Sequence, residues 1–228
     1  EMAEEILASG KADAVAMCRA LIADPYWPKK VRAGRLNEIH QCLRCTNCLA
    51  EMHPTDQFHC DVNPFSGHEV LFQDLKPKAA RAKTVWIAGG GPGGMTAAIT
   101  AAERGHTVTL FEMGERLGGL LNYTDKDQKF KRDLHLFKEK LVARVGELPI
   151  QVKLNTKLTP DMVKEGKPDA LLIAIGAVPI FPPIPGLTAE AVTTGYDCYL
   201  HPEQVGHKVV CIGGGLVGCE SALHLGME

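Results

Sequence analysis

Residues 84–94 read TVWIAGGGPGG, and this stretch decides the fold. Its first five residues are β-branched or apolar and predict a strand over 84–88. The glycines that follow predict a tight turn, after which Met95 to about Arg104 predicts a helix that Gly105 ends. Residues 107–112 predict the next strand. Strand, helix and strand together form a βαβ unit, so we expect an α/β fold.

The glycine-rich turn has the spacing of a dinucleotide site. Gly89 permits the tight turn, Gly91 lets the backbone approach a pyrophosphate, and Gly94 allows the helix to pack closely on the strand. The helix N-terminus then offers free N–H groups and a positive dipole end to phosphates. Glu112 ends the second strand, where its carboxylate can accept hydrogen bonds from a ribose. A glycine-rich turn without a ligand is the alternative.

A second turn of the same kind follows near the end of the sequence. Residues 208–212 predict a strand, and Gly213, Gly215 and Gly218 repeat the spacing before the start of a helix that carries Glu220. The next strand would hold the residue that separates a ribose hydroxyl from a 2′-phosphate, and it lies beyond the sequence. The choice between NADH and NADPH is therefore left open.

Four cysteines predict a metal site. Cys42, Cys45 and Cys48 are separated by two residues each, and Cys60 follows after eleven more. Three thiolates on one tight loop and a fourth from further along form a sulfur cage that suits a [4Fe–4S] cluster, or less often zinc. Structural zinc usually has two separated cysteine pairs, or cysteine with histidine. Disulfides and scattered core cysteines are further alternatives.

The chemistry of electron transfer suggests which nucleotide each turn binds. A nicotinamide delivers two electrons together as hydride, whereas an iron–sulfur cluster accepts one at a time, and a flavin can do both. We therefore expect FAD at the first turn, which is nearer to the cysteines, and NAD(P)H at the second.

The composition is that of an ordinary globular protein. The 228 residues carry a net charge of −2 and are 45% hydrophobic, which gives no reason to expect nucleic acid or a membrane as a partner. Eight cysteines with no secretory signal point to the cytoplasm. The oligomeric state is left open. Because both ends fall within expected helices, we expect an internal fragment of a longer chain.

Other segments show weaker patterns. Residues 36–82 lack a clear periodicity, as expected of a stretch that a metal cluster orders. We expect helices over residues 1–9, which Gly10 ends, over 25–32 and over 130–145. We expect further strands over residues 13–17, 150–154 and 170–175.

With these motifs in place, the chain resembles the iron–sulfur flavoenzymes related to Old Yellow Enzyme, a group that includes 2,4-dienoyl-CoA reductase, 2-enoate reductases and trimethylamine dehydrogenase. The segment Ala16-Met17-Cys18-Arg19 is similar to the last strand of the group's FMN-binding TIM barrel. The resemblance implies that Arg19 contacts the FMN phosphate, with the Cys18 backbone beside it. Val62-Asn63-Pro64 after the last cysteine is similar to the group's [4Fe–4S] segment, and Gly118-Gly119 to its FAD segment.

The resemblance also implies four parts and a reaction. The parts are the end of the TIM barrel (1–35), the [4Fe–4S] segment with a linker (36–82), an FAD-binding part (83–185) and the start of an NAD(P)-binding domain (186–228). Electrons would pass from NAD(P)H through FAD and the cluster to FMN, which would reduce the activated C=C bond of a small enoate or dienoyl-CoA.

Two other functions fit the motifs. One is an amine dehydrogenase with ADP at the first turn, and the other is a non-catalytic, zinc-stabilised nucleotide-binding module. Whether the longer chain is a reductase or a dehydrogenase, we expect this fragment to contain no substrate-facing catalytic residue. We also expect it to be inactive on substrate by itself.

Overall fold

The structure is a computed structural model that describes residues 2–50, 58–72, 78–127, 130–187, 190 and 192–227. The chain forms two compact units, Glu1–Lys76 and Pro77–Glu228. Residues 51–57 and 73–77, which belong to the predicted cysteine segment and linker, lie outside the described residues.

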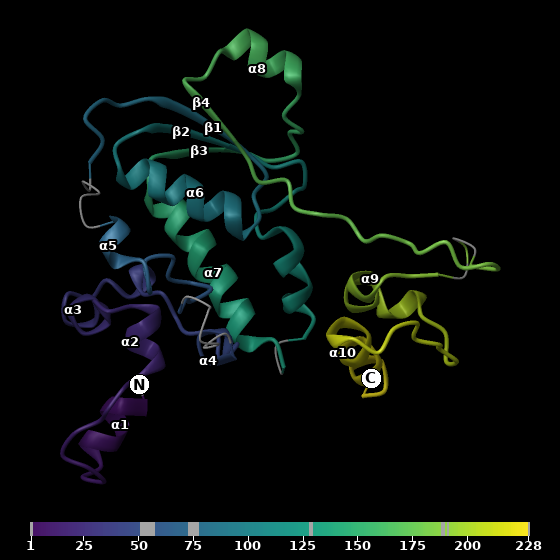
Figure 1. Ribbon diagram of the computed structural model, residues 1–228, viewed down its shortest axis with the longest axis horizontal. Coiled ribbons are helices and arrows are strands. Elements are labelled where there is room, and N and C mark those ends of the chain that lie inside the picture. The colour runs from purple at the N-terminus through teal and green to yellow at the C-terminus, as the bar shows by residue number, and fades with distance from the viewer. Residues whose placement is uncertain are drawn as a thin grey trace. The chain divides into compact units, whose positions relative to one another are not determined.

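The second unit is built on a parallel sheet of four strands, β1 (Thr84–Ala88), β2 (Thr107–Phe111), β3 (Ile150–Lys153) and β4 (Ala170–Ile173). Their order is β3-β2-β1-β4 (Figure 1). The chain therefore moves outward from β1 to β3 and returns to the other side of β1 for β4. The crevice at such a reversal, beyond the carboxyl ends of the strands, is where parallel sheets bind ligands. The predicted α/β fold is confirmed.

Helices cover this sheet and hold its core. The long helices are α6 (Pro92–Glu103) and α7 (Arg132–Glu147), which pack together beside the sheet (Figure 1). Alternate residues of a strand point to opposite faces, so Val85 and Ile87 enter the core while Trp86 points away from it. Trp86 meets Gly166 of α8 (Pro160–Gly166).

Shorter helices complete the second unit. They are η2 (Gly119–Asp125), α9 (Gly195–Leu200), η4 (Pro202–Gln204) and α10 (Leu216–Leu225). The helix α10 packs on α9, and α9 in turn contacts η2.

The first unit consists of short helices and loops. They are α1 (Met2–Ala8), α2 (Arg19–Ala23), α3 (Trp27–Arg32), η1 (Leu36–Glu38), α4 (Asn47–Ala50) and α5 (Glu69–Phe72). The predicted N-terminal helix is confirmed as α1, and Gly10, whose φ is +66°, follows its end at Ala8. The helix α2 was not predicted.

Two predicted strands are wrong. Residues 13–17 form no strand, and the described part of the first unit contains no strand with which they could pair. Residues 208–212 also form no strand, and Val210 is 87% exposed. The apolar pattern of both segments is that of a strand, yet a strand forms only where a neighbour satisfies its backbone groups.

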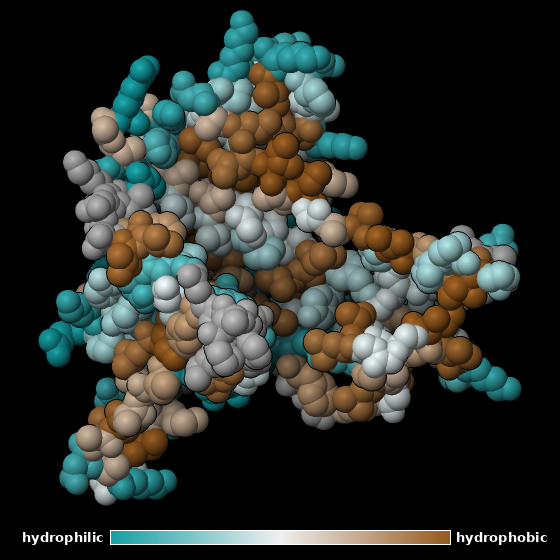
Figure 2. All heavy atoms as spheres, in the orientation of Figure 1, coloured by the Kyte–Doolittle hydropathy of each residue, from teal (hydrophilic) through white to brown (hydrophobic). Residues whose placement is uncertain are grey.

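Apolar side chains also lie exposed beyond β4. Ile173, Ile175, Val178 and Ile180 are between 71% and 90% exposed. Figure 2 shows apolar side chains along the segment that follows β4. This edge of the sheet therefore has no neighbouring strand in the described chain.

We expect Ile87→Ala to lower the free energy of unfolding by about 2–5 kcal/mol, because Ile87 is fully buried and its truncation leaves a cavity. The matched control is Ile180→Ala, at a position that is 90% exposed, which we expect to change it by less than about 0.5 kcal/mol. Equilibrium urea denaturation measures both. Equal losses would mean that Ile87 does not lie in the core.

Candidate functional site

The first glycine-rich turn lies at the carboxyl end of β1, between β2 and β4. The Gly89 N–H donates to the Phe111 carbonyl at 2.8 Å, and the Ala174 N–H donates to the Ala88 carbonyl at 2.8 Å. Gly89 has a φ of +105°, and a Cβ there would lie 2.3 Å from the Ala174 carbonyl oxygen. Only glycine fits this position.

Helix α6 starts directly against this turn. A Cβ on Gly94 would lie 1.8 Å from the Gly89 carbonyl oxygen, so the helix approaches the strand as closely as its backbone allows. Gly91 caps the helix with an extended backbone. The first N–H groups of a helix have no partner inside it, and in α6 they begin at the glycine-rich turn. That arrangement can bind a phosphate.

A second pair of glycines covers the turn. The Gly118 N–H donates to the Gly90 carbonyl at 2.9 Å. A Cβ on Gly119 would lie 2.9 Å from the Gly91 Cα. The two glycines, predicted to belong to the FAD segment, thus lie against the residues predicted to contact the pyrophosphate.

Glu112 follows β2 and lies beside the same turn. Its Oε2 accepts the Gly90 N–H at 2.7 Å, and its Oε1 accepts the Gly114 N–H at 2.6 Å. A carboxylate has about four acceptor positions, so about two remain for a ribose. These two backbone hydrogen bonds fix the direction of the side chain.

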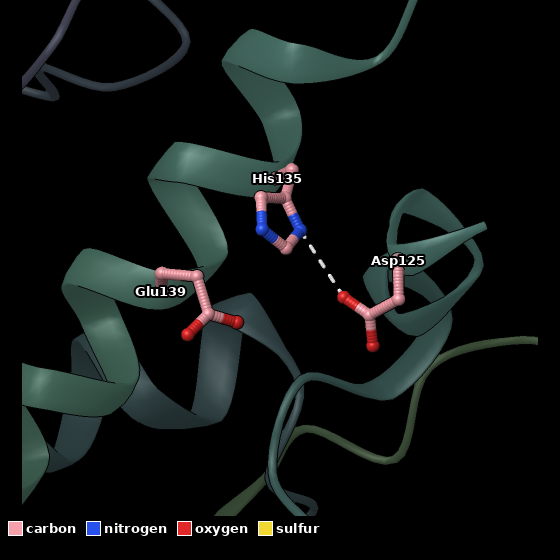
Figure 3. A group of neighbouring side chains, drawn as sticks. All are labelled: Asp125, His135 and Glu139. Carbon is pink, nitrogen blue, oxygen red and sulfur yellow. Dashed lines mark ion pairs between the residues drawn. The ribbon is translucent and has the colours of Figure 1, made fainter. Parts of the chain in front are cut away.

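A charged cluster holds η2, which begins at Gly119, to helix α7. Asp125 at the end of η2 forms ion pairs with Lys138, with Arg116 at 2.7 Å, and with His135 at 3.1 Å. Figure 3 shows His135 and Glu139 on α7 facing Asp125. Lys138 is 3% exposed, so its ammonium group lies inside this cluster.

This cluster is an anchor rather than a metal site. Burial by itself would raise the pKa of Asp125, but the hydrogen bond and charge of Lys138, together with those of Arg116, outweigh it and hold the pKa low. The carboxylate is thus already neutralised by protein cations. The cluster therefore fixes η2, whose first residue Gly119 lies against the first glycine-rich turn.

The second glycine-rich turn repeats the geometry of the first. Gly213 has a φ of +108°, and a Cβ on Gly218 would lie 2.0 Å from the Gly213 carbonyl oxygen. Gly215 caps α10 with an extended backbone, as Gly91 caps α6. The likeness holds although the segment before it is not a strand.

In the first unit, the four predicted metal ligands line one pocket. Cys42, Cys45, Cys48 and Cys60 are all free thiols. The other residues that line it are Arg19, Ile22, Leu43, Thr46, Asp61 and Val62. Arg19 begins α2 and Cys18 precedes it as the helix cap.

The backbone of the cysteine loop is strained. Arg44 and Thr46 have φ values of 57° and 63°, which non-glycine residues rarely adopt. The Arg44 N–H donates to the Cys42 sulfur at 3.4 Å. Left-handed residues in such loops turn backbone N–H groups toward an anionic centre, as in phosphate and iron–sulfur sites. The strain indicates a functional loop.

Two buried polar side chains anchor this loop. Asp24, 1% exposed, accepts the Lys30 ammonium at 2.6 Å and the His40 N–H at 3.0 Å, directly before the cysteines. The Asn63 amide, three residues after Cys60, donates to the Ile22 carbonyl at 2.7 Å. The sequence predicts only the helix over 25–32 that follows Asp24, and it gives no signal of the distant partners of this carboxylate.

Together, a parallel sheet with a glycine-rich turn at its switch point and a second turn of the same geometry define a Rossmann-like dinucleotide-binding protein. The model of the family "Pyridine nucleotide-disulphide oxidoreductase" matches residues 83–226, and the chain belongs to this family.

Similar proteins extend the likeness to the whole chain. The NADH oxidase of Thermoanaerobacter brockii is 38% identical over 99% of this chain and 35% of its own. The cinnamate reductase of Clostridium sporogenes is 37% identical over 99% of this chain and 33% of its own. A solved complex of 2-naphthoyl-CoA reductase with 2-naphthoyl-CoA is 36% identical, with a TM-score of 0.89, over 99% of this chain and 34% of that one. The predicted resemblance is confirmed.

The chain therefore spans about a third of the length of these relatives. Within the described residues, no helix is long and apolar enough to cross a membrane.

We expect Gly94→Ala to abolish or strongly weaken FAD binding, because the added Cβ forces α6 away from β1. The control is Gly93→Ala on the same helix turn, where a Cβ would meet no atom within 4 Å. Flavin content after purification and a binding titration measure both variants. Equal FAD affinity in both would contradict the close approach.

We expect Asp24→Asn to lower the free energy of unfolding by about 1–3 kcal/mol at neutral pH, because Lys30 loses its buried partner. Burial alone would raise the pKa of Asp24, but the hydrogen bonds from Lys30 and His40 lower it. The stability that Asp24 contributes is thus present above the unfolded pKa of about 3.9 and is lost as the pH falls through the lower folded pKa.

Denaturation at pH values from about 7 down to about 3 measures this difference between wild type and variant. The control is Asp161→Asn, whose side chain is 82% exposed and whose ion pair we expect to contribute little. If the difference in the free energy of unfolding between wild type and Asp24→Asn stays constant down to the lowest pH, the pKa of Asp24 is not lowered by its partners.

Proposed function

We propose that the chain is the middle part of an NAD(P)H-dependent reductase that passes electrons through FAD and a [4Fe–4S] cluster to FMN. The observation that carries this proposal is the pocket lined by all four cysteines, in a chain that also holds two dinucleotide turns. In this proposal residues 1–35 end an FMN-binding barrel, 36–82 hold the cluster, 83–185 bind FAD and 186–228 begin the NAD(P)H domain.

The four thiols are not gathered closely enough to hold a single zinc ion as they stand. Tetrahedral zinc with Zn–S bonds of about 2.3 Å brings its sulfurs within about 3.8 Å of one another. Among the described residues, the one group of three possible ligands within 4.8 Å is Asp125, His135 and Glu139, so no three of the cysteine thiols are that close. A cluster binds each thiolate through a separate iron and needs wider spacing.

Burial raises the pKa of the Cys45 thiol, and nearby Asp61 raises it further, against a hydrogen bond from the Asn47 N–H. The free thiol is therefore held protonated, and a metal that binds it must displace that proton. The cluster, when bound, supplies one-electron transfer, and the four cysteines hold it.

The two turns receive different nucleotides in this proposal. At the first, Gly91 and Gly94 admit the pyrophosphate of FAD, Gly118 and Gly119 cover it, and Glu112 accepts the ribose hydroxyls. At the second, Gly213, Gly215 and Gly218 admit NAD(P)H. The intact second turn favours a reductase over an amine dehydrogenase, in which we expect that turn to be degraded.

The names of two relatives support a substrate class for this proposal. Their names describe reductases of cinnamate and of 2-naphthoyl-CoA. We infer a small substrate whose reducible carbon–carbon double bond is conjugated to a carboxylate or a thioester, in a cytoplasmic enzyme. Arg19 is assigned to the FMN phosphate with the Cys18 backbone beside it.

We expect the full-length protein to contain about four irons and four acid-labile sulfides per chain. Cys45→Ser removes one ligand, so iron content and visible absorbance of the cluster fall together. Cys211→Ser, an exposed cysteine outside the pocket, is the control and keeps both at the wild-type level. Zinc in place of iron and sulfide would overturn the proposal and support the zinc-stabilised module.

A further inference from the structure

A contact joins the first nucleotide-binding half of the second unit to helix α10. The Lys131 ammonium, directly before α7, lies 2.5 Å from Glu220 Oε2 on α10. The Lys131 side chain is only 12% exposed, whereas that of Glu220 is 40% exposed. The sequence predicts Glu220 as a cofactor-binding residue, and its carboxylate lies beside this lysine.

An aromatic cluster surrounds the ion pair. Tyr199 of α9 is 6% exposed, stacks on His224 of α10 at 4.2 Å between ring centroids, and meets Tyr123 of η2 edge-on at 5.3 Å. Its hydroxyl donates to the Glu220 carbonyl at 3.3 Å. Burial raises the pKa of Tyr199 to about 12, with help from the charges of Asp127 and Glu220, so the hydroxyl stays a donor at neutral pH.

Two of the elements that meet here, η2 and α10, begin at a glycine-rich turn. Gly119, which lies against Gly91 in the first turn, is the first residue of η2. Gly215 of the second turn caps α10. Tyr123 lies about one helical turn into η2 and Glu220 about one turn into α10, so a shift of α10 against η2 moves the two turns relative to one another.

We propose that the Lys131–Glu220 ion pair is a positioning contact that fixes the second nucleotide turn relative to the first and so sets the approach of the nicotinamide to the flavin. The proposal rests on the proposed function, because it takes hydride transfer between those two sites as the reaction. Neither side chain is a catalytic residue.

An ion pair suits this role better than the aromatic packing around it. Aromatic contacts tolerate small sliding motions, whereas a largely buried ammonium must stay beside its carboxylate. Hydride transfer requires close and well-oriented atoms, and a displacement of about 1 Å can slow such a reaction about 100-fold.

The test uses the full-length holoenzyme and charge reversal. Lys131→Glu, Glu220→Lys and the double variant are mixed anaerobically with NADH or NADPH, and stopped-flow absorbance gives the rate of flavin reduction and the nucleotide Kd. The control is Lys164→Glu, which breaks the exposed Lys164–Asp161 pair of α8 and lies outside this contact.

We expect each single variant to reduce flavin at least about tenfold more slowly than wild type, with the nucleotide Kd changed less than about threefold. The double variant recovers most of the rate, and the control keeps the wild-type rate. Rates within twofold of wild type in both single variants would overturn the proposal, as would single-variant losses that the double variant does not recover.

The contact itself is tested apart from the reaction. A double-mutant cycle compares the thermal unfolding of the wild type, the two single variants and the double variant. It measures the coupling between positions 131 and 220. If the two positions show no coupling, Lys131 and Glu220 do not form the ion pair and the proposal is overturned. Wild-type protein whose flavin neither nucleotide reduces overturns the proposed function instead, so the two failures are distinguishable.

Discussion

The close approach of α6 to the end of β1 is the constraint on which the second unit depends. No Cβ fits on Gly94 beneath the Gly89 carbonyl, and this contact aims the start of the helix into the crevice where the strand order reverses. Hydrogen bonds to the backbone of Gly90 hold both Glu112 and Gly118 beside that point. The same close approach recurs between Gly218 and Gly213, which indicates two sites of one kind.

The first unit is organised differently, because its described residues contain no sheet. Its loops are held by buried polar groups, with Asp24 before the cysteines and Asn63 after them. Strained residues at Arg44 and Thr46 turn the loop around one pocket. A bound cluster would add the folding free energy that a small apolar core cannot supply.

The features predicted from the sequence are those with a local cause. The strands β1 and β2 follow from short apolar runs, and the turns follow from glycines whose backbone other residues cannot adopt. Residues 13–17 and 208–212 were predicted wrongly because pairing is not a local property. The Lys131–Glu220 pair could not be predicted, because its members lie 89 residues apart and the glycine pattern that singles out Glu220 gives no sign of Lys131.

The central claim is that nucleotide and cysteine sites belong to one electron path, and an anaerobic titration of the full-length protein with NADH and with NADPH tests it most directly. Optical absorbance follows the flavins and electron paramagnetic resonance follows the cluster. The account predicts that at least one nucleotide bleaches the flavin and produces the signal of a reduced cluster. Flavin bleached by neither nucleotide, or bleached with no cluster signal, would contradict it.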